Sequence, residues 1–476
     1  MEYIIHGRKP ENLFRFFEEI SAIPRGSGNE KGIADYLENF AKVRGLECCR
    51  DRVNNIFIKM KGSAGRENEP AVLLQAHTDM VCEKNEGVKH DFLKDGLELY
   101  LDGRFLRARG TTLGADDGIG VVTALAFLDG ASESHPPLEC LFTTSEETGM
   151  DGVNGFDFSH VSARKMLNLD SEDIGTAIVG CAGGVRVRLT LKGTPEAAVG
   201  KTLRLCVKGL AGGHSGSNIA DGRANANKLM GRILLALGDD LRLVSLTGGG
   251  KSNAIPRECE ALIVTPDAEK TAKLAKSVAT GIAGELGEWD NGFEFICEEV
   301  LGQSKAFSTQ LTAKALAMIG TPANGVLEMS KRIDGFVEYS RNLGVIRTKA
   351  DGISFTFFAR SAIEGQLDAT CCELASLAKL CGAEMKINER YHGWDYSPES
   401  EVRDAYAAAY KRVTGKDINI AAIHAGLECG VIKERIPDMD IIAIGPDAID
   451  IHSPDEKLDL DTAETFFAVI AEMLAK

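Results

Sequence analysis

One histidine and several acidic residues stand where the sequence predicts that β-strands end. The apolar run of residues 71–77 finishes at His77, and Asp79 follows two positions later. Because residues i and i+2 of a strand point to one side, the carboxylate of Asp79 can reach behind the imidazole. A histidine backed by a carboxylate is typical of a metal ligand. The same pair also arises by chance, so a purely structural role stays open on this motif alone.

Carboxylates follow other predicted strands and turns as well. They are Asp116 and Asp117 in the glycine-flanked turn TTLGADDGIG, Glu146 and Glu147 after the strand LECLFTTS, and Asp170 at the end of KMLNLD. Each could be a solvated turn, but ligand sites in open α/β sheets gather at the carboxyl ends of strands. If these strands share one sheet, the converging charges cost on the order of several kcal/mol unless a cation neutralises them. Two divalent metal ions would do so, and of two adjacent glutamates one could bind metal while the other acts as a base on water.

Predicted strands alternate with helices over the first third of the chain. Apolar runs indicate strands at residues 53–60, 71–77, 137–145 and 165–170, and helical spacing indicates helices at 11–23, 29–44 and 114–128. This alternation favours an α/β fold in which a sheet is flanked by helices.

The pattern changes after Gly183. Runs such as VRVRLTLKG alternate apolar and polar residues at period two, which is typical of antiparallel strands with one solvated face. Helical patterns lie among these runs, and from about residue 385 the pattern of the first third returns. We therefore expect residues 1–183 and 385–476 to form one catalytic domain, with residues 184–384 inserted as an α+β domain.

Composition and net charge argue against some classes of binding partner. The 476 residues include 54 Lys and Arg against 70 Asp and Glu, and the net charge of −16 disfavours nucleic acid and anionic membranes as partners. No apolar run reaches the ~18 residues that a membrane helix needs, and charged residues interrupt the N-terminus before a signal sequence could form. The 12 cysteines include no CxxC pair and are interpreted as reduced thiols. We expect a cytoplasmic protein.

Six motifs in order make the chain similar to a known family. The succession QAHTDM, TTLGADDGIG, FTTSEETG, LNLDSED, GGHSG and DIHSPDE resembles the di-zinc peptidase family of carboxypeptidase G, aminoacylase and carnosinase. Two further motifs, HAGLECG and GGGKSNAIPRE, make the sequence most similar to the bacterial aminoacyl-histidine dipeptidase branch (peptidase D, Xaa-His dipeptidase) of that family. The resemblance spans nearly the full chain and implies a zinc-peptidase catalytic domain with an inserted lid domain.

The resemblance also implies roles for the acidic and histidine residues. It assigns Asp116 as the bridge between two Zn²⁺ ions, His77 and Asp170 to one ion, Glu147 and His452 to the other, Asp79 as the residue that orients His77, and Glu146 as the general acid/base. Imidazole and carboxylate ligands suit zinc, but Co²⁺ or Mn²⁺ would also satisfy them.

Further residues of the chain could contact substrate. The resemblance implies that His214, in GGHSG, stabilises an oxyanion from the lid, in its own site or in that of a partner subunit, and that Asn253 contacts substrate. Arg360 could clamp a terminal carboxylate, although a surface arginine is equally open. His424 and Glu428 flank a small-residue turn that could line the pocket, with Glu428 a candidate for binding the free amino group; a structural role is the alternative for both.

The expected activity is that of a metal-dependent dipeptidase acting on unblocked dipeptides, Xaa-His (carnosine-like) dipeptides among them. Its expected partners are small peptide substrates and a second copy of the chain, bound through the lid domain. The alternatives are a deacylase of N-acyl amino acids or a broader aminopeptidase of the same family. From another class, a non-catalytic metal- or peptide-binding protein would keep the ligands and lose the base, and the presence of Glu146 argues against it.

Overall fold

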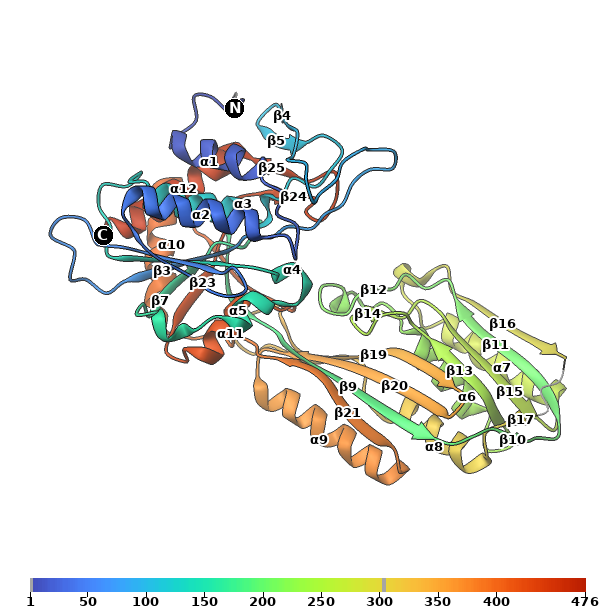
Figure 1. Ribbon diagram of the computed structural model, residues 1–476. Helices are drawn as coiled ribbons and strands as arrows, with labels where there is room; N and C mark the ends of the chain where they lie inside the picture. Colours follow the sequence, from blue (N-terminus) through green and yellow to red (C-terminus); the bar gives the residue numbers. More distant parts are fainter. Residues whose placement is uncertain (1–2, 302–304) are drawn as a thin grey trace. The chain divides into compact units, whose positions relative to one another are not determined.

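Two structural units divide the chain in the computed structural model, which describes residues 3–301 and 305–476 (Figure 1). Unit 1 comprises Met1–Gly180, Tyr396–Ala422 and Leu427–Lys476, and unit 2 comprises Cys181–Asp395 and Ile423–Gly426. The expected boundary after residue 384 falls at the start of a strand that pairs within unit 2, so this unit extends to Asp395. None of the helices in the described ranges is long and apolar enough to cross a membrane.

Unit 1 is built on a mixed sheet. In spatial order its strands are β1 (Glu47–Arg50), β2 (Ile56–Met60), β6 (Leu138–Thr143), β3 (Val72–His77), β7 (Lys165–Asn168), β23 (Asp440–Ala443), β8 (Thr176–Cys181) and β22 (Asn419–Ile423). The central strands β6, β3, β7 and β23 run parallel. Every residue of β3 and β6 is buried, in accord with their apolar sequences, because a parallel sheet is covered on both faces.

Helices cover this sheet (Figure 1). They are α1 (Glu11–Ser21), α2 (Lys31–Arg44), α3 (Ala115–Leu128), α4 (Glu146–Gly149), α5 (Asp151–Gly155), α10 (Glu401–Thr414), α11 (Glu428–Arg435) and α12 (Leu460–Leu474). A small antiparallel sheet of β4 (Leu99–Asp102), β5 (Phe105–Ala108), β24 (Ala448–Ile449) and β25 (Lys457–Asp459) joins two distant segments of the chain. The α/β class expected from the sequence is confirmed.

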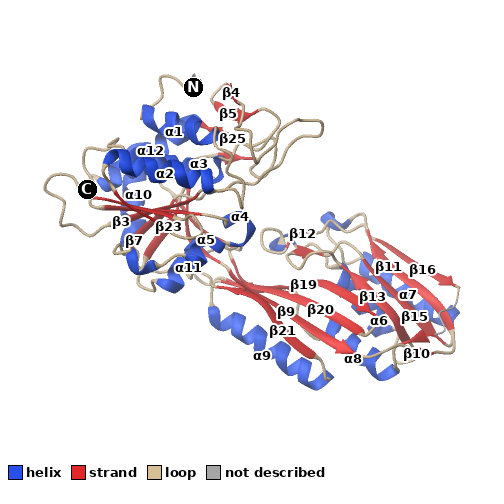
Figure 2. Cartoon of the chain, viewed as in Figure 1, coloured by secondary structure: helices blue, strands red, loops and turns tan. Residues whose placement is uncertain are grey.

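Unit 2 contains a long antiparallel sheet (Figure 2). Its path runs through β16 (Glu294–Val300), β11 (Lys201–Lys208), β15 (Cys259–Thr265), β13 (Arg242–Gly248), β19 (Val337–Lys349), β20 (Gly352–Ser361), β9 (Gly183–Lys192) and β21 (Glu384–Tyr391), and β18 (Gly325–Met329) pairs with β19. The helices α6 (Ala226–Ala236), α7 (Ala268–Ala283), α8 (Thr309–Gly320) and α9 (Glu364–Cys381) share one apolar core with alternate residues of these strands. The period-two runs of the sequence therefore do form half-covered antiparallel strands.

The strand order of unit 2 repeats itself. The segment β11–α6–β13–β15–α7–β16 follows a βαββαβ pattern, and β9, α8, β19, β20, α9 and β21 follow the same pattern around it. Reading outward from the middle of the sheet, the order is β13-β15-β11-β16 in one half and β19-β20-β9-β21 in the other. The halves join where β13 pairs antiparallel with β19, so one half is nested in the sequence of the other.

Candidate active site

Three parallel strands of unit 1 bring candidate ligands to one edge of the sheet. His77 is the last residue of β3 and pairs in register with Thr143, the last residue of β6. Glu146 and Glu147 follow at the start of α4, after a turn in which Ser145 takes a positive φ of 55°. Asp170 lies two residues beyond β7, which pairs with the other side of β3. Side chains separated by many residues in sequence thus meet at the carboxyl ends of neighbouring strands.

Asp116 links two groups of possible metal ligands. One group is His77, Asp116 and Asp170, the other is Asp116, Glu147 and His452, and the ligand atoms within each group lie within 4.8 Å of one another. The two oxygens of Asp116 point to different groups: Oδ1 lies 2.9 Å from His77 Nε2, and Oδ2 lies 3.0 Å from His452 Nε2. In the second group, His452 Nε2 also lies 3.1 Å from Glu147 Oε1.

The chemistry of these donors fits a pair of divalent cations. Each group offers one imidazole nitrogen and carboxylate oxygens, the set that zinc, cobalt and manganese accept. Glu147 Oε1 is buried, and it accepts no backbone N–H within the described ranges; its polar neighbour there is His452 Nε2. Burial raises the pKa of Asp170, and the neighbouring carboxylates Asp116 and Glu147 raise it further. A site that gathers this much buried negative charge requires positive charge to be stable when ionised.

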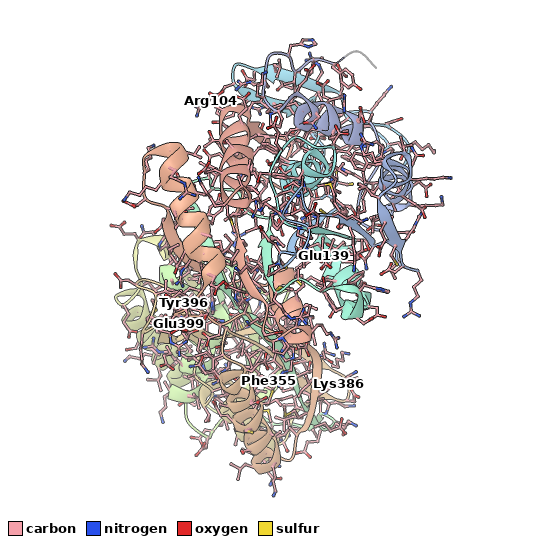
Figure 3. All side chains as sticks on the ribbon, turned by 90° about the vertical axis from the view of Figure 1, so that its left-hand side faces the viewer. Arg104, Glu139, Phe355, Lys386, Tyr396 and Glu399 are labelled. Atoms are coloured by element: carbon pink, nitrogen blue, oxygen red, sulfur yellow. The ribbon has the colours of Figure 1, made fainter. Side chains whose placement is uncertain are left out.

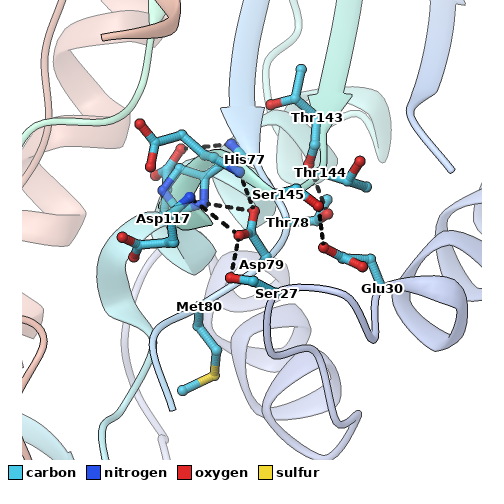
Figure 4. A network of polar contacts seen from close by, with 12 residues as sticks. Ser27, Glu30, His77, Thr78, Asp79, Met80, Asp117, Thr143, Thr144 and Ser145 are labelled. Carbon is cyan, nitrogen blue, oxygen red and sulfur yellow. Dashed lines mark hydrogen bonds and ion pairs between the residues drawn. The ribbon is translucent and has the colours of Figure 1, made fainter. Parts of the chain in front are cut away.

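Asp79 lies behind His77, a candidate ligand (Figure 4). Its Oδ1 lies 3.5 Å from His77 Nδ1, and Ser27 Oγ donates a 2.7 Å hydrogen bond to its Oδ2. The backbone N–H groups of Glu146 and Glu147 also donate to the Asp79 carboxylate, at 3.1 and 3.3 Å. One buried carboxylate therefore connects a ligand histidine with the turn that carries both glutamates.

Glu146 lies next to the ligand groups and belongs to neither. Burial raises the pKa of Glu146 to about 9, and the carboxylates of Asp170, Glu428 and Glu147 add to that increase. Its proton affinity therefore depends on the charge of its surroundings. A carboxyl group with a raised pKa beside a metal site is the type of residue that serves as a general acid/base.

Glu428 lies under the same edge of the sheet. It is fully buried, and its Oε2 accepts hydrogen bonds of 2.6 Å from Gln75 Nε2 and from Thr143 Oγ1. Its Oε1 is buried with no donor in the part of the chain that the structure describes. Burial raises the pKa of Glu428 to about 7. Because Gln75 and Thr143 belong to β3 and β6, Glu428 is anchored to the two strands that end at the ligands.

His214, in unit 2, is a neutral imidazole with a defined tautomer. Burial lowers its pKa to about 4, and Arg360 lowers it further. Its Nδ1 accepts from the backbone N–H groups of Gly216 and Ser217, at 3.3 and 3.2 Å, which leaves the proton on Nε2. Arg360 Nη2 lies 3.2 Å from this Nε2. Two N–H groups this close together can both donate to one acceptor oxygen.

Two other candidate residues of unit 2, Asn253 and His424, lie near this pair. Arg360 is 4% exposed, donates a 2.9 Å hydrogen bond to Tyr391 Oη, and forms no ion pair within the described ranges. Burial lowers the pKa of His424 to about 3, with Arg360 as the next cause, and His424 Nε2 lies 2.6 Å from Ser340 Oγ. The carbonyl of Asn253 accepts from Ser215 N at 2.8 Å, next to His214. Within the part of the chain that the structure describes, no carboxylate pairs with this cluster of basic side chains in unit 2.

The structure separates two residues that share a sequence motif. His424 belongs to unit 2 and Glu428 to unit 1, although only four positions separate them in HAGLECG. Sequence reasoning also missed two buried charged residues beside the ligands, Arg25 and Glu456. The signal for Glu456 was its place in DIHSPDE, four residues after His452; Arg25 had no comparable signal.

Comparisons with known proteins agree with this geometry. Residues 73–476 match the model of Peptidase family M20/M25/M40. The chain is 38% identical to the cytosol non-specific dipeptidase of Escherichia coli (strain K12), over 98% of this chain and 97% of that protein. The chain belongs to this peptidase family and is a metallopeptidase, and the resemblance drawn from the motifs is confirmed.

Solved structures show the same fold. The aminoacylhistidine dipeptidase from Vibrio alginolyticus has a TM-score of 0.92 and 39% identity, with 98% of this chain and 97% of that chain covered. The aminopeptidase PepT from Bacillus cereus has a TM-score of 0.56 and 15% identity over 98% of this chain and 99% of that chain. At that identity the second comparison shows the fold alone.

Proposed function

We propose that this chain is a metal-dependent dipeptidase that hydrolyses unblocked dipeptides, Xaa-His dipeptides among them, with two Zn²⁺ ions as its cofactor. The observation that carries the proposal is the shared carboxylate of Asp116 between two ligand groups, with Glu146 beside them. The dipeptidase activities named for the E. coli and Vibrio relatives support the substrate class.

Residues of unit 1 would bind the metal ions, transfer the proton and position a ligand. His77, Asp116 and Asp170 would hold one ion, and Asp116, Glu147 and His452 the other. Bound divalent ions of this kind lower the pKa of the attacking water and polarise the scissile carbonyl. Glu146 accepts the proton of that water and passes it to the leaving amine. Asp79 fixes the ring of His77, so that its Nε2 faces the ion.

Charged side chains of the protein that bind the two ends of the substrate would limit its length to two residues. Glu428 keeps one buried oxygen free of donors, and a substrate ammonium group supplies the donors that this oxygen lacks. In unit 2, Arg360 would bind the terminal carboxylate and His214 would donate from Nε2 to the developing oxyanion, with Asn253 and His424 beside them. An N-acyl amino acid lacks the ammonium group and would lose the first of these contacts.

The remaining proposals concern the insert and the location of the protein. We propose that residues 184–384 act as a lid that closes over substrate, that the chain forms a homodimer through this lid, and that the protein is cytoplasmic. The name of the E. coli relative, a cytosol dipeptidase, supports the location.

Metal content tests the two-ion site. We expect close to two divalent ions per chain after gentle dialysis, because Asp116, Glu147 and Asp170 bring more negative charge than one ion neutralises. Elemental analysis of the purified protein measures this number. Treatment with a chelator should remove activity, and added Zn²⁺ should restore it. Full activity with one ion or none per chain would contradict the mechanism.

A further inference from the structure

A buried carboxylate binds the loop that carries Asp116. The side chain of Glu456 is 2% exposed and accepts hydrogen bonds from four consecutive backbone N–H groups. Leu113 N and Gly114 N donate to Oε2 at 2.7 and 2.9 Å, and Ala115 N and Asp116 N donate to Oε1 at 2.7 and 3.4 Å. Four amide donors aimed at one carboxylate define the direction of the whole segment, which we call the Asp116 loop (residues 113–116).

Arg25 binds the carbonyl side of the same region. Its side chain is 1% exposed, and its Nη2 donates a 2.5 Å hydrogen bond to Gly114 O. Its Nη1 donates to Thr78 O and Asp79 O at 3.1 and 3.3 Å. The guanidinium therefore joins the Asp116 loop to the segment that follows His77. At Gly114, whose φ is +66°, an added Cβ would lie 2.5 Å from Arg25 Nη2, so the close approach depends on glycine.

The opposite charges of Glu456 and Arg25 act on opposite ends of the peptide group that joins Gly114 to Ala115. Arg25 donates to its carbonyl oxygen, on Gly114, and Glu456 accepts from its N–H, on Ala115. Buried backbone groups left without partners are unfavourable, so the loop conformation depends on both side chains. This conformation sends the two oxygens of Asp116 toward different ligand groups.

Glu456 also connects the turn that carries His452 to the Asp116 loop. It lies four residues after His452, and its N–H donates to Ser453 O at 3.1 Å within the same turn. His452 itself takes a positive φ of 60°, a conformation that surrounding contacts must stabilise. One short segment thus supplies a candidate ligand and the carboxylate that fixes the Asp116 loop.

We propose that Glu456 and Arg25 are positioning residues for the two-metal site. Glu456 holds the Asp116 loop by its amides, Arg25 holds it by a carbonyl, and together they keep the bridging carboxylate aimed at both ions. The proposal rests on the proposed metal site and goes beyond it, because neither side chain is expected to touch metal or substrate.

The variant Glu456→Gln tests the proposal. The amide has the same shape, but it places an NH₂ group against backbone N–H donors. We expect the affinity for metal to fall ~10-fold or more, the size typical of lost support behind a ligand. The probe is Co²⁺, titrated into metal-free protein and followed by visible absorption, with Zn²⁺ competition as a second reading. Measurement of binding separates this effect from a loss of turnover alone.

Glu139→Gln is the matched control (Glu139 is labelled in Figure 3). Glu139 is also a buried carboxylate of unit 1, 3% exposed, that accepts from the backbone N–H groups of Ser162 and Ala163. It lies at the start of β6, whose other end carries Thr143 beside His77. We expect this variant to lower the Tm and to leave Co²⁺ affinity at the wild-type value.

Each outcome either supports or contradicts the positioning role of Glu456. Weakened Co²⁺ binding in Glu456→Gln alone supports the proposal; wild-type affinity in that variant, or an equal loss in Glu139→Gln, overturns it. If Glu456→Gln does not fold, Arg25→Lys takes its place, because lysine keeps the charge and cannot make the same three hydrogen bonds. Wild-type protein that binds no Co²⁺ would overturn the proposed metal site itself, and the positioning role with it.

Discussion

Replacing Glu146 with glutamine is expected to remove nearly all hydrolysis and to leave the metal bound. The change deletes the group that accepts the proton of the attacking water, and general acid/base residues typically contribute ~10²- to 10⁴-fold to the rate. Glutamine has nearly the same shape, and Glu146 belongs to neither ligand group, so the cluster of His77, Asp116, Glu147, Asp170 and His452 stays complete. Steady-state kinetics and elemental analysis on the same sample measure both quantities.

His77→Ala and His452→Ala are the matched controls for this prediction. Each removes an imidazole from one ligand group, so each should lose metal together with activity. A Glu146→Gln protein that keeps the wild-type kcat would exclude Glu146 as the base. A Glu146→Gln protein that loses zinc, as the two histidine variants should, would show that Glu146 is a ligand instead.

His214→Ala should lower kcat more than it raises KM. The Nε2–H of His214 would donate to an oxygen that becomes negative only in the transition state, and loss of one such donor typically costs ~10²-fold or more. Metal content should not change, because the ligand groups lie in unit 1 and His214 in unit 2. Kinetics over a range of substrate concentrations separate the two parameters, and an unchanged kcat would remove His214 from the mechanism.

A mixed dimer distinguishes two locations for the action of His214. If it serves the partner subunit, inactive His214→Ala and inactive Glu146→Gln subunits should together regain some activity, since one of the two sites would be intact. No recovery in a verified mixed dimer would place His214 in the site of its own subunit.

Much of the fold could be predicted because hydrophobic patterns follow burial. Strand β3 is mostly apolar and is buried between parallel neighbours, whereas β9 alternates and is half covered. The small sheet of β4, β5, β24 and β25 was missed, since its strands are very short and come from distant parts of the chain. The repeated βαββαβ order of unit 2 was also missed, because the two halves share a topology and no visible sequence period.

Three of the candidate ligands could be predicted from their positions, because His77, Glu147 and Asp170 follow predicted strands. Asp116 lies in a glycine-flanked turn, and the place of His452 rested on the resemblance of the motifs. The structure brings these five side chains into two groups. Arg25 and Glu456 could not be found this way, since they bind backbone groups whose directions depend on the folded loop. The tautomer of His214 likewise depends on two backbone amides.

The relative rates of hydrolysis of matched substrates test the central claim most directly. Metal-loaded protein is incubated with an Xaa-His dipeptide, its N-acetyl derivative, a tetrapeptide that contains the same pair, and N-acetyl amino acids, and kcat/KM is measured for each. If Glu428 and Arg360 bind the two termini, the free dipeptide should be cleaved fastest and acetylation should slow cleavage strongly. Faster cleavage of the tetrapeptide or of an N-acetyl amino acid than of any dipeptide would contradict the assignment.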